Sequence, residues 1–350
     1  MKIFLPTIIS NFKLYNEIIP KLSEYYLKGE SQNPIISLIN TEKINYESIP
    51  LLLGILDIIY NVQEEQVPLE LVYRPKLLYC LDHALFFYYA DIKLGYIKYS
   101  KELIGGFSDY VNEEYRGAHI MHVYYPKLDF FEYSENEQNN IRAQTYEVMR
   151  YHVIPIDYGV VLSDIEKLWI NEMENYKTML AELITNAILY SSSLCYTLFH
   201  SNRYKSMLSI CDVGKGFKNS LVKRRGSKSY PVDKVEEFVT IKKKYSIKYA
   251  IYELEDFFDI MEILFYSELQ NRINLFFLKK LVVNSGGVLR IHSGTTQVVF
   301  NTKKCEKCSK KIVDCIGCLL NRTSQAIKVS PVKCFESKLR GVQIEVEFSR

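Results

Sequence analysis

The sequence is poor in several features that mark whole classes of protein. It contains a single tryptophan, and no apolar run reaches the roughly 18 residues of a membrane-spanning helix. The formal net charge of +3 is too close to neutral to indicate nucleic-acid binding. Residues 1–6 lack the small-residue cleavage pattern of a signal peptide and are expected to form a strand. These absences predict a cytoplasmic protein without a membrane segment and argue against a nucleic-acid partner.

The 350 residues are enough for two domains, each with its own hydrophobic core. The stretch 132–140 is polar and contains few apolar residues, so we expect a linker there. We therefore predict one domain at 1–131 and a second at 132–350. Eight cysteines without a signal peptide favour a reducing cytosol, in which thiols stay free or bind metal.

Apolar runs and helical patterns alternate in the first 130 residues. The runs expected to be strands are 3–9, 35–39 and 69–73, and those expected to be helices are 17–26, 49–59 and 75–89. This order predicts an α/β layer fold. The succession of strand, short loop and helix resembles a STAS-like domain, the partner fold of anti-sigma-factor kinases. An unrelated α/β scaffold is the alternative.

A carboxylate and an amide lie four residues apart in the segment 181–187. On a helix, Glu182 and Asn186 would share one face. Their oxygens could orient a water molecule and hold a hydrated Mg²⁺, because magnesium takes few protein ligands and keeps several waters. The spacing therefore predicts a helical site for Mg²⁺ and water.

A second motif follows about thirty residues later, where Asp212 ends an apolar, strand-like run at 206–211. An aspartate at a strand end can accept a hydrogen bond from an exocyclic amine such as that of adenine. Gly214 and Gly216 come next, and glycine lets the backbone approach a ligand closely. The two motifs together predict an ATP site.

These motifs resemble the GHKL, or Bergerat-fold, ATP-binding domain, and are nearest to anti-sigma-factor kinases. The family's N-box, E-L-x-x-N-A, matches residues 182–187, and its first glycine box, D-x-G-x-G-F/I, matches residues 212–217. The resemblance covers roughly residues 140–350 and implies a Bergerat-type α/β sandwich that binds ATP. It further implies that Glu182 is the general base, Asn186 the Mg²⁺ ligand and Asp212 the residue that reads adenine.

The second glycine box of that family, G-x-G-L, is altered here. Arg272 and Asn274 stand at its glycine positions, although the helix that follows and the Gly-Gly turn at 286–287 fit. Those glycines face phosphate at a helix N-terminus, where free backbone N–H groups bind it. The side chains either crowd the phosphates or, for Arg272, contact one directly. Val342 also replaces a threonine of the closing strand.

Two CxxC pairs lie near the C-terminus, and their members are Cys305, Cys308, Cys315 and Cys318. Four thiolates satisfy tetrahedral Zn²⁺ and leave no open position, so the metal would be structural. We expect a small zinc-bearing hairpin at 302–322, inserted in the ATP-binding domain. Unliganded thiols are the alternative, and Cys334 is a possible substitute ligand.

Two functions stay open on this basis. The first is a cytosolic ATP-binding regulator with slow Mg²⁺-dependent ATP hydrolysis or phosphoryl transfer, in which Glu182 orients a water or a Ser/Thr hydroxyl. The second is a non-hydrolysing nucleotide sensor or interaction scaffold, suggested by the altered glycine box. In either case we expect ATP or ADP as ligand and a protein, or a second copy of the chain, as partner. No histidine stands in a phospho-acceptor context, so an autophosphorylating histidine kinase is not expected.

Overall fold

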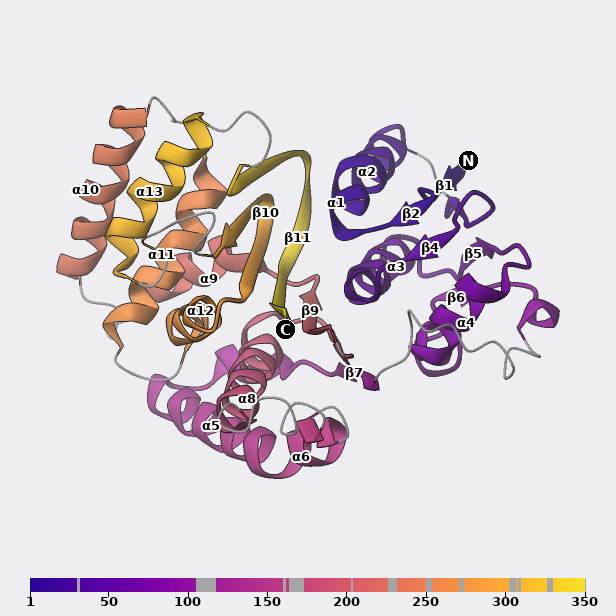
Figure 1. Cartoon of the computed structure of the whole chain (residues 1–350), viewed down its shortest axis with the longest axis horizontal. Helices are drawn as coiled ribbons and strands as arrows, with labels where there is room; N and C mark the ends of the chain where they lie inside the picture. The colour runs from indigo at the N-terminus through magenta and orange to yellow at the C-terminus, as the bar shows by residue number, and fades with distance from the viewer. Residues whose placement is uncertain are drawn as a thin grey trace.

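The computed structural model combines helices and β-sheets, as predicted for the α/β class. It describes residues 1–29, 32–104, 118–159, 162–163, 173–202, 204–225, 232–249, 254–270, 274–301, 307, 310–325 and 330–349. Figure 1 shows the N-terminal region, in indigo and purple, beside the larger C-terminal region.

Short parallel strands form the centre of the N-terminal region. The larger sheet has the order β1-β3-β5-β6, and β2 pairs with β4. Their bounds are β1 Lys2–Phe4, β2 Ile8–Ile9, β3 Ile35–Ser37, β4 Lys43–Ile44, β5 Val67–Glu70 and β6 Ile97–Lys98. The helices are α1 Asn11–Lys13, α2 Ile19–Leu27, α3 Ile49–Gln63 and α4 Pro75–His83. The predicted alternation of strands and helices is therefore confirmed.

A five-stranded antiparallel sheet forms the centre of the C-terminal region, in the order β10-β11-β9-β8-β7. The strands are β7 Ala118–Tyr124, β8 Cys195–Ser201, β9 Lys205–Asp212, β10 Val288–Phe300 and β11 Val332–Ser349. Strand β7 was predicted to belong to the first domain, but it pairs with β8. The five-stranded sheet therefore includes residues 118–124, which lie inside the range predicted for the first domain. A strand's own residue pattern does not identify its pairing partner, so the sequence could not predict this pairing.

The stretch 132–140 was predicted to be a linker, but it contains the start of α5. Ser134 and Glu137 form a capping box, in which each side chain bonds to the other's backbone N–H. The polar composition of this stretch therefore belongs to an exposed helix start.

Helices lie on one side of the five-stranded sheet. They are α5 Glu135–Val148, α6 Ile154–Asp157, α8 Met173–Tyr190, α9 Gly216–Arg225, α10 Val232–Tyr249, α11 Glu255–Leu269, α12 Leu275–Asn284 and α13 Ile312–Gln325. Among them, α5 and α10 pack on other helices. Leu180 and Ile184 of α8, Leu264 of α11 and Val282 of α12 are buried in one core with the sheet. Figure 1 shows α10, α11 and α13 on the side of this sheet away from the N-terminal region.

The N-terminal region packs on the opposite face of the same sheet. Ile55 of α3 shares a buried cluster with Tyr196 of β8 and Cys211 of β9. Leu339 of β11 belongs to the same cluster. The sheet is therefore a layer between helices α8, α11 and α12 on one side and the N-terminal region on the other.

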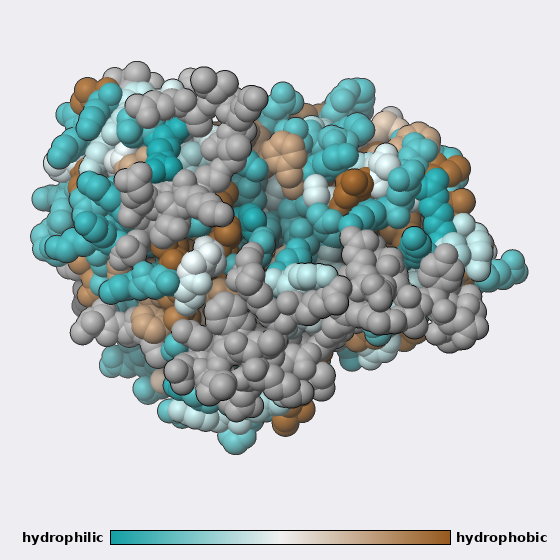
Figure 2. All heavy atoms as spheres, in the orientation of Figure 1, coloured by the Kyte–Doolittle hydropathy of each residue, from teal (hydrophilic) through white to brown (hydrophobic). Residues whose placement is uncertain are grey.

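None of the described helices is both long and apolar enough to cross a membrane. On the face shown in Figure 2, most of the described residues are hydrophilic, and hydrophobic ones occur in small groups. Scattered exposed hydrophobic side chains are normal on a folded protein.

Candidate functional site

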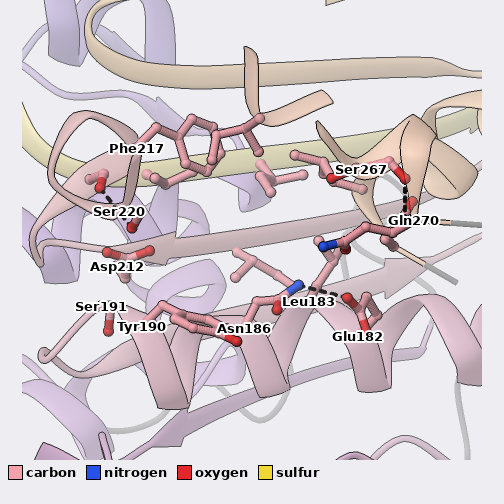
Figure 3. A pocket seen from close by; sticks show the side chains of 18 residues that line it. Glu182, Leu183, Asn186, Tyr190, Ser191, Asp212, Phe217, Ser220, Ser267 and Gln270 are labelled. Carbon is pink, nitrogen blue, oxygen red and sulfur yellow. Dashed lines mark hydrogen bonds between the residues drawn. The ribbon is translucent and has the colours of Figure 1, made fainter. Parts of the chain in front are cut away.

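A pocket lies between α8, the inner strands β9 and β11, and the facing ends of α11 and α12. Its empty volume is about 840 Å³, part of it open to solvent. Glu182, Asn186, Asp212, Gly216 and Asn274, all predicted from the sequence, line this pocket. Figure 3 shows Asp212 towards one end of the pocket, Glu182 and Gln270 towards the other, and Asn186 between them.

Glu182 and Asn186 do share one face of α8, as their spacing predicted. The Asn186 amide Nδ2 donates to Glu182 Oε1 at 3.0 Å (Figure 3). This bond uses the NH₂ group of Asn186. The Oδ1 atom of the same side chain is the one that a hard cation such as Mg²⁺ would bind. The helix is held in place by its opposite face, where Leu180 and Ile184 are buried in the core.

An arginine that sequence reasoning missed holds Glu182. Arg142 of α5 donates through Nη2 to both carboxylate oxygens, at 2.6 and 2.7 Å. The two side chains are 12% and 6% exposed, so this ion pair is nearly buried. Arg142 is not among the residues that line the pocket. It therefore supports Glu182 from outside the pocket and offsets its charge.

Asp212 ends β9 and is buried, with 8% of its surface exposed. Its Oδ1 accepts a hydrogen bond from the backbone N–H of Gly214 at 3.1 Å. Burial raises the pKa of Asp212 to about 7, although the backbone amides of Gly214 and Val342 act against that rise. A carboxyl of this kind gains or loses its proton near neutral pH and can serve as a hydrogen-bond acceptor for a ligand.

The two glycines after Asp212 are required for different reasons, Gly214 by close packing and Gly216 by its backbone conformation. A side chain at Gly214 would place its Cβ 1.9 Å from the carbonyl oxygen of Ser191, at the end of α8. Gly216 has a φ of +69°, a left-handed conformation that favours glycine. The backbone N–H of Lys215 donates to the Ser191 carbonyl at 3.0 Å. These contacts fix the turn against α8, so Gly214 shapes the pocket without lining it.

Asn274 caps the N-terminus of α12 with its own side chain. Its Oδ1 accepts from the backbone N–H groups of Phe276 and Phe277, at 3.1 and 3.2 Å. Its Nδ2 donates to the carbonyl oxygen of Ser267 at 2.6 Å. Asn274 is 5% exposed and lines the pocket. The N–H groups of Phe276 and Phe277, two of those that could bind a phosphate, are therefore occupied. Arg272, the other predicted residue of this box, lies outside the described residues.

The described residues that line the pocket include no lysine, arginine or histidine. They include two carboxylates, Glu182 and Asp212, and an apolar floor to which Ile210, Val342 and Ile344 contribute. Phe217 adds an aromatic ring. The pocket thus offers an apolar surface, hydrogen-bond acceptors and oxygen ligands for a cation.

The predicted hairpin at 302–322 is wrong for its second half, because residues from Ile312 onward form α13. Apolar residues at helical spacing bury one face of this helix, and Cys315 is fully buried there. Cys318 is partly exposed, while Cys305 and Cys308 lie outside the described residues. Within the part of the chain that is described, no three potential metal ligands come together.

Comparisons of the chain with protein-family models, curated proteins and solved structures gave no match.

Proposed function

We propose that the pocket binds an adenine nucleotide and that the protein is an ATP-binding regulator with slow Mg²⁺-dependent hydrolysis or phosphoryl transfer. The observation that carries this proposal is the meeting of Glu182, Asn186 and Asp212 in one pocket. The first two come from α8 and the third from the end of β9. The antiparallel sheet with helices on one face supports a Bergerat-type sandwich, and the βα alternation before it supports a STAS-like N-terminal domain.

The adenine ring would lie at the Asp212 end of the pocket. There the carboxylate of Asp212 would accept a hydrogen bond from the exocyclic amine, and Ile210, Val342 and Ile344 would contact the flat ring. An apolar pocket with a few well-placed polar groups is typical of small-molecule sites.

The phosphates would extend towards Glu182 and Asn186. Asn186 Oδ1 would take Mg²⁺, which binds few protein oxygens and brings phosphate oxygens with it. Glu182 would orient the attacking water or hydroxyl. In phosphoryl transfer the protein contributes mainly positioning and charge stabilisation, so this set of groups is sufficient for slow turnover.

A second candidate function, a non-hydrolysing nucleotide sensor or scaffold, is favoured by the Arg142 ion pair. Both oxygens of Glu182 accept from Arg142, and one of them also accepts from Asn186. Three of the roughly four acceptor positions of this carboxylate are then in use, which leaves one for an attacking water. In a sensor, nucleotide binding would change the contacts of the protein with a partner and the nucleotide would not be consumed.

Incubation of the purified protein with γ-labelled ATP and Mg²⁺ separates these functions. Free labelled phosphate indicates an ATPase, labelled protein indicates phosphoryl transfer, and binding without either indicates a sensor. The Glu182→Gln variant should lose turnover but keep nucleotide binding. Turnover that survives in this variant would refute the role of Glu182, and failure of ATP and ADP to bind would refute the proposed function.

One structural Zn²⁺, held by Cys305, Cys308, Cys315 and Cys318, stays a proposal. Cys315 and Cys318 support it because residues three apart on α13 lie on neighbouring positions of one helix face. Elemental analysis should find about one zinc per chain, and much less in a Cys305→Ser, Cys308→Ser variant. Absence of zinc from the wild-type protein would refute the site.

A further inference from the structure

A phosphate in this pocket would ordinarily be bound by the N-terminus of α12. Free backbone N–H groups at a helix start attract anions, and the helix dipole adds to that attraction. The first residues of α12 do reach the pocket, since both Asn274 and Leu275 line it. The position is therefore suitable for a phosphate, but two of its backbone donors, the N–H groups of Phe276 and Phe277, are already in use.

The cap formed by Asn274 is complete. Its Oδ1 satisfies the N–H groups of Phe276 and Phe277, and its Nδ2 is satisfied by the Ser267 carbonyl. A phosphate at this helix start would have to displace the Oδ1 and leave a buried amide to find other partners. Asparagine is among the best N-cap residues, so the cap is stable without a ligand.

The charges around the pocket act in the same direction. Among the described residues that line it, none is basic and two are carboxylates. Arg142, which lies outside the pocket, donates two hydrogen bonds to Glu182. Among the described lining residues, a triphosphate without a metal ion would therefore meet hydrogen-bond acceptors and no cation.

We propose that Asn274 is a specificity-determining residue that makes the pocket recognise the nucleoside part of its ligand. The proposal rests on the proposed function, because it assumes that an adenine nucleotide is the ligand. The adenine ring and ribose supply most of the affinity, the two capped N–H groups of α12 contribute nothing to phosphate binding, and phosphate contributes chiefly through Mg²⁺ at Asn186.

The test is a calorimetric comparison of adenosine, ADP and ATP, each with EDTA and with Mg²⁺. Without the metal, adenosine and ATP should bind within about threefold of each other. With Mg²⁺, ATP should gain about tenfold in affinity while adenosine stays unchanged.

The Asn274→Gly variant removes the cap and frees the two N–H groups, and glycine is well tolerated at this position of a helix. Without Mg²⁺, its affinity for ATP should rise about tenfold and its affinity for adenosine should not change. The matched control is Asn274→Asp, which keeps an acceptor for both N–H groups, loses the donor to Ser267 and adds a negative charge, so ATP should bind no better than to the wild type. A thermal denaturation curve of each variant verifies that it is folded.

Wild-type protein that binds ATP far more tightly than adenosine without Mg²⁺ would overturn this inference and leave the proposed function intact. So would an Asn274→Gly variant with unchanged affinity for ATP. If none of the three ligands binds the wild type under either condition, the proposed function itself is wrong, and the inference falls with it.

Discussion

The two faces of the five-stranded sheet bury polar groups in different ways. Along β9 and β11, alternate side chains point to opposite faces. The residues facing the pocket are Ile210, Asp212, Val342 and Ile344, and those facing the N-terminal region are Ser209, Cys211, Gln343 and Glu345. One layer of backbone thus separates the pocket from the N-terminal region.

The face towards the N-terminal region is closed by side-chain hydrogen bonds. Asn11 donates to Glu345 Oε1 at 2.8 Å, and the Tyr15 hydroxyl donates to Gln343 Oε1 at 2.7 Å. The ring of Tyr15 also stacks on His292, with centroids 3.6 Å apart. Burial raises the pKa of Glu345 to about 7 and lowers that of His292 to about 3.

Strands β9 and β11 therefore place one buried acid with a raised pKa on each face of the sheet, and of these two acids only Asp212 faces a cavity. Glu345 is bonded to Asn11 and lies beneath the N-terminal region. Asp212 lines a cavity, where it accepts hydrogen bonds from the backbone N–H groups of Gly214 and Val342. The comparison suggests that a buried acid joined to another side chain serves the fold, while one that faces a cavity serves a ligand.

The largest effect on the free energy of unfolding is expected at Arg142, which holds Glu182 from outside the pocket. Arg142→Met would leave the Glu182 carboxylate buried without its cation, which should lower the free energy of unfolding by roughly 3 kcal/mol. Urea denaturation measures this loss. Arg150→Met is the matched control, because the contact of Arg150 with the exposed Glu174 is long, at 3.4 Å, and its loss should matter much less. Equal losses in both variants would show that Arg142 has no special role.

A smaller effect is expected on the closed face. Tyr15→Phe removes the donor to Gln343 and leaves a buried acceptor without it, so the free energy of unfolding should fall by about 1 kcal/mol. Adenosine affinity should stay unchanged, because Tyr15 lies on the far side of the sheet from the pocket. A clear change in that affinity would show that the two faces are coupled and not independent.

The smallest effect is expected for the dependence of adenosine affinity on pH. Since the pKa of Asp212 is about 7, its carboxyl loses its proton as the pH rises through neutrality. The ionised form is the better acceptor for an amine, so adenosine affinity should be about fivefold higher at pH 8 than at pH 6. Calorimetry at the two pH values measures this. Asp212→Asn should abolish the dependence, and Glu345→Gln, which changes the acid of the other face, should retain it.

The raised pKa of Asp212 affects folding in the opposite direction, because it makes the protein less stable as the pH rises. Because burial raises the pKa of Asp212 from 3.8 to about 7, the associated stability is fully present below about pH 4 and is lost as the pH rises through 7. A stability difference between wild type and Asp212→Asn that does not change over this range would contradict the assigned shift.

Local spacing made much of the site predictable. The i, i+4 relation of Glu182 and Asn186 and the strand-end position of Asp212 needed only a helix and a strand. The cap at Asn274 was also visible in principle, because asparagine before an apolar helical run is an N-cap signal. The capping box at Ser134 was a comparable signal for a helix start, but the polar composition of residues 132–140 was interpreted as a linker.

Contacts between distant parts of the chain could not be predicted in this way. Arg142 lies 40 residues before Glu182 and pairs with it only because α5 packs on α8. The pairing of β7 with β8, and the packing of Asn11 and Tyr15 on β11, likewise depend on tertiary structure. No local pattern in a single sequence specifies such partners.

The central claim, that the pocket beside α8 binds an adenine nucleotide, is tested most directly by calorimetric titration with Mg²⁺ and ATP. The wild type should bind one ATP per chain, and Asp212→Ala should bind it at least about tenfold more weakly. Ser209→Ala, on the same strand but facing the N-terminal region, should bind like the wild type. No binding by the wild type, or equal binding by Asp212→Ala, would contradict the claim.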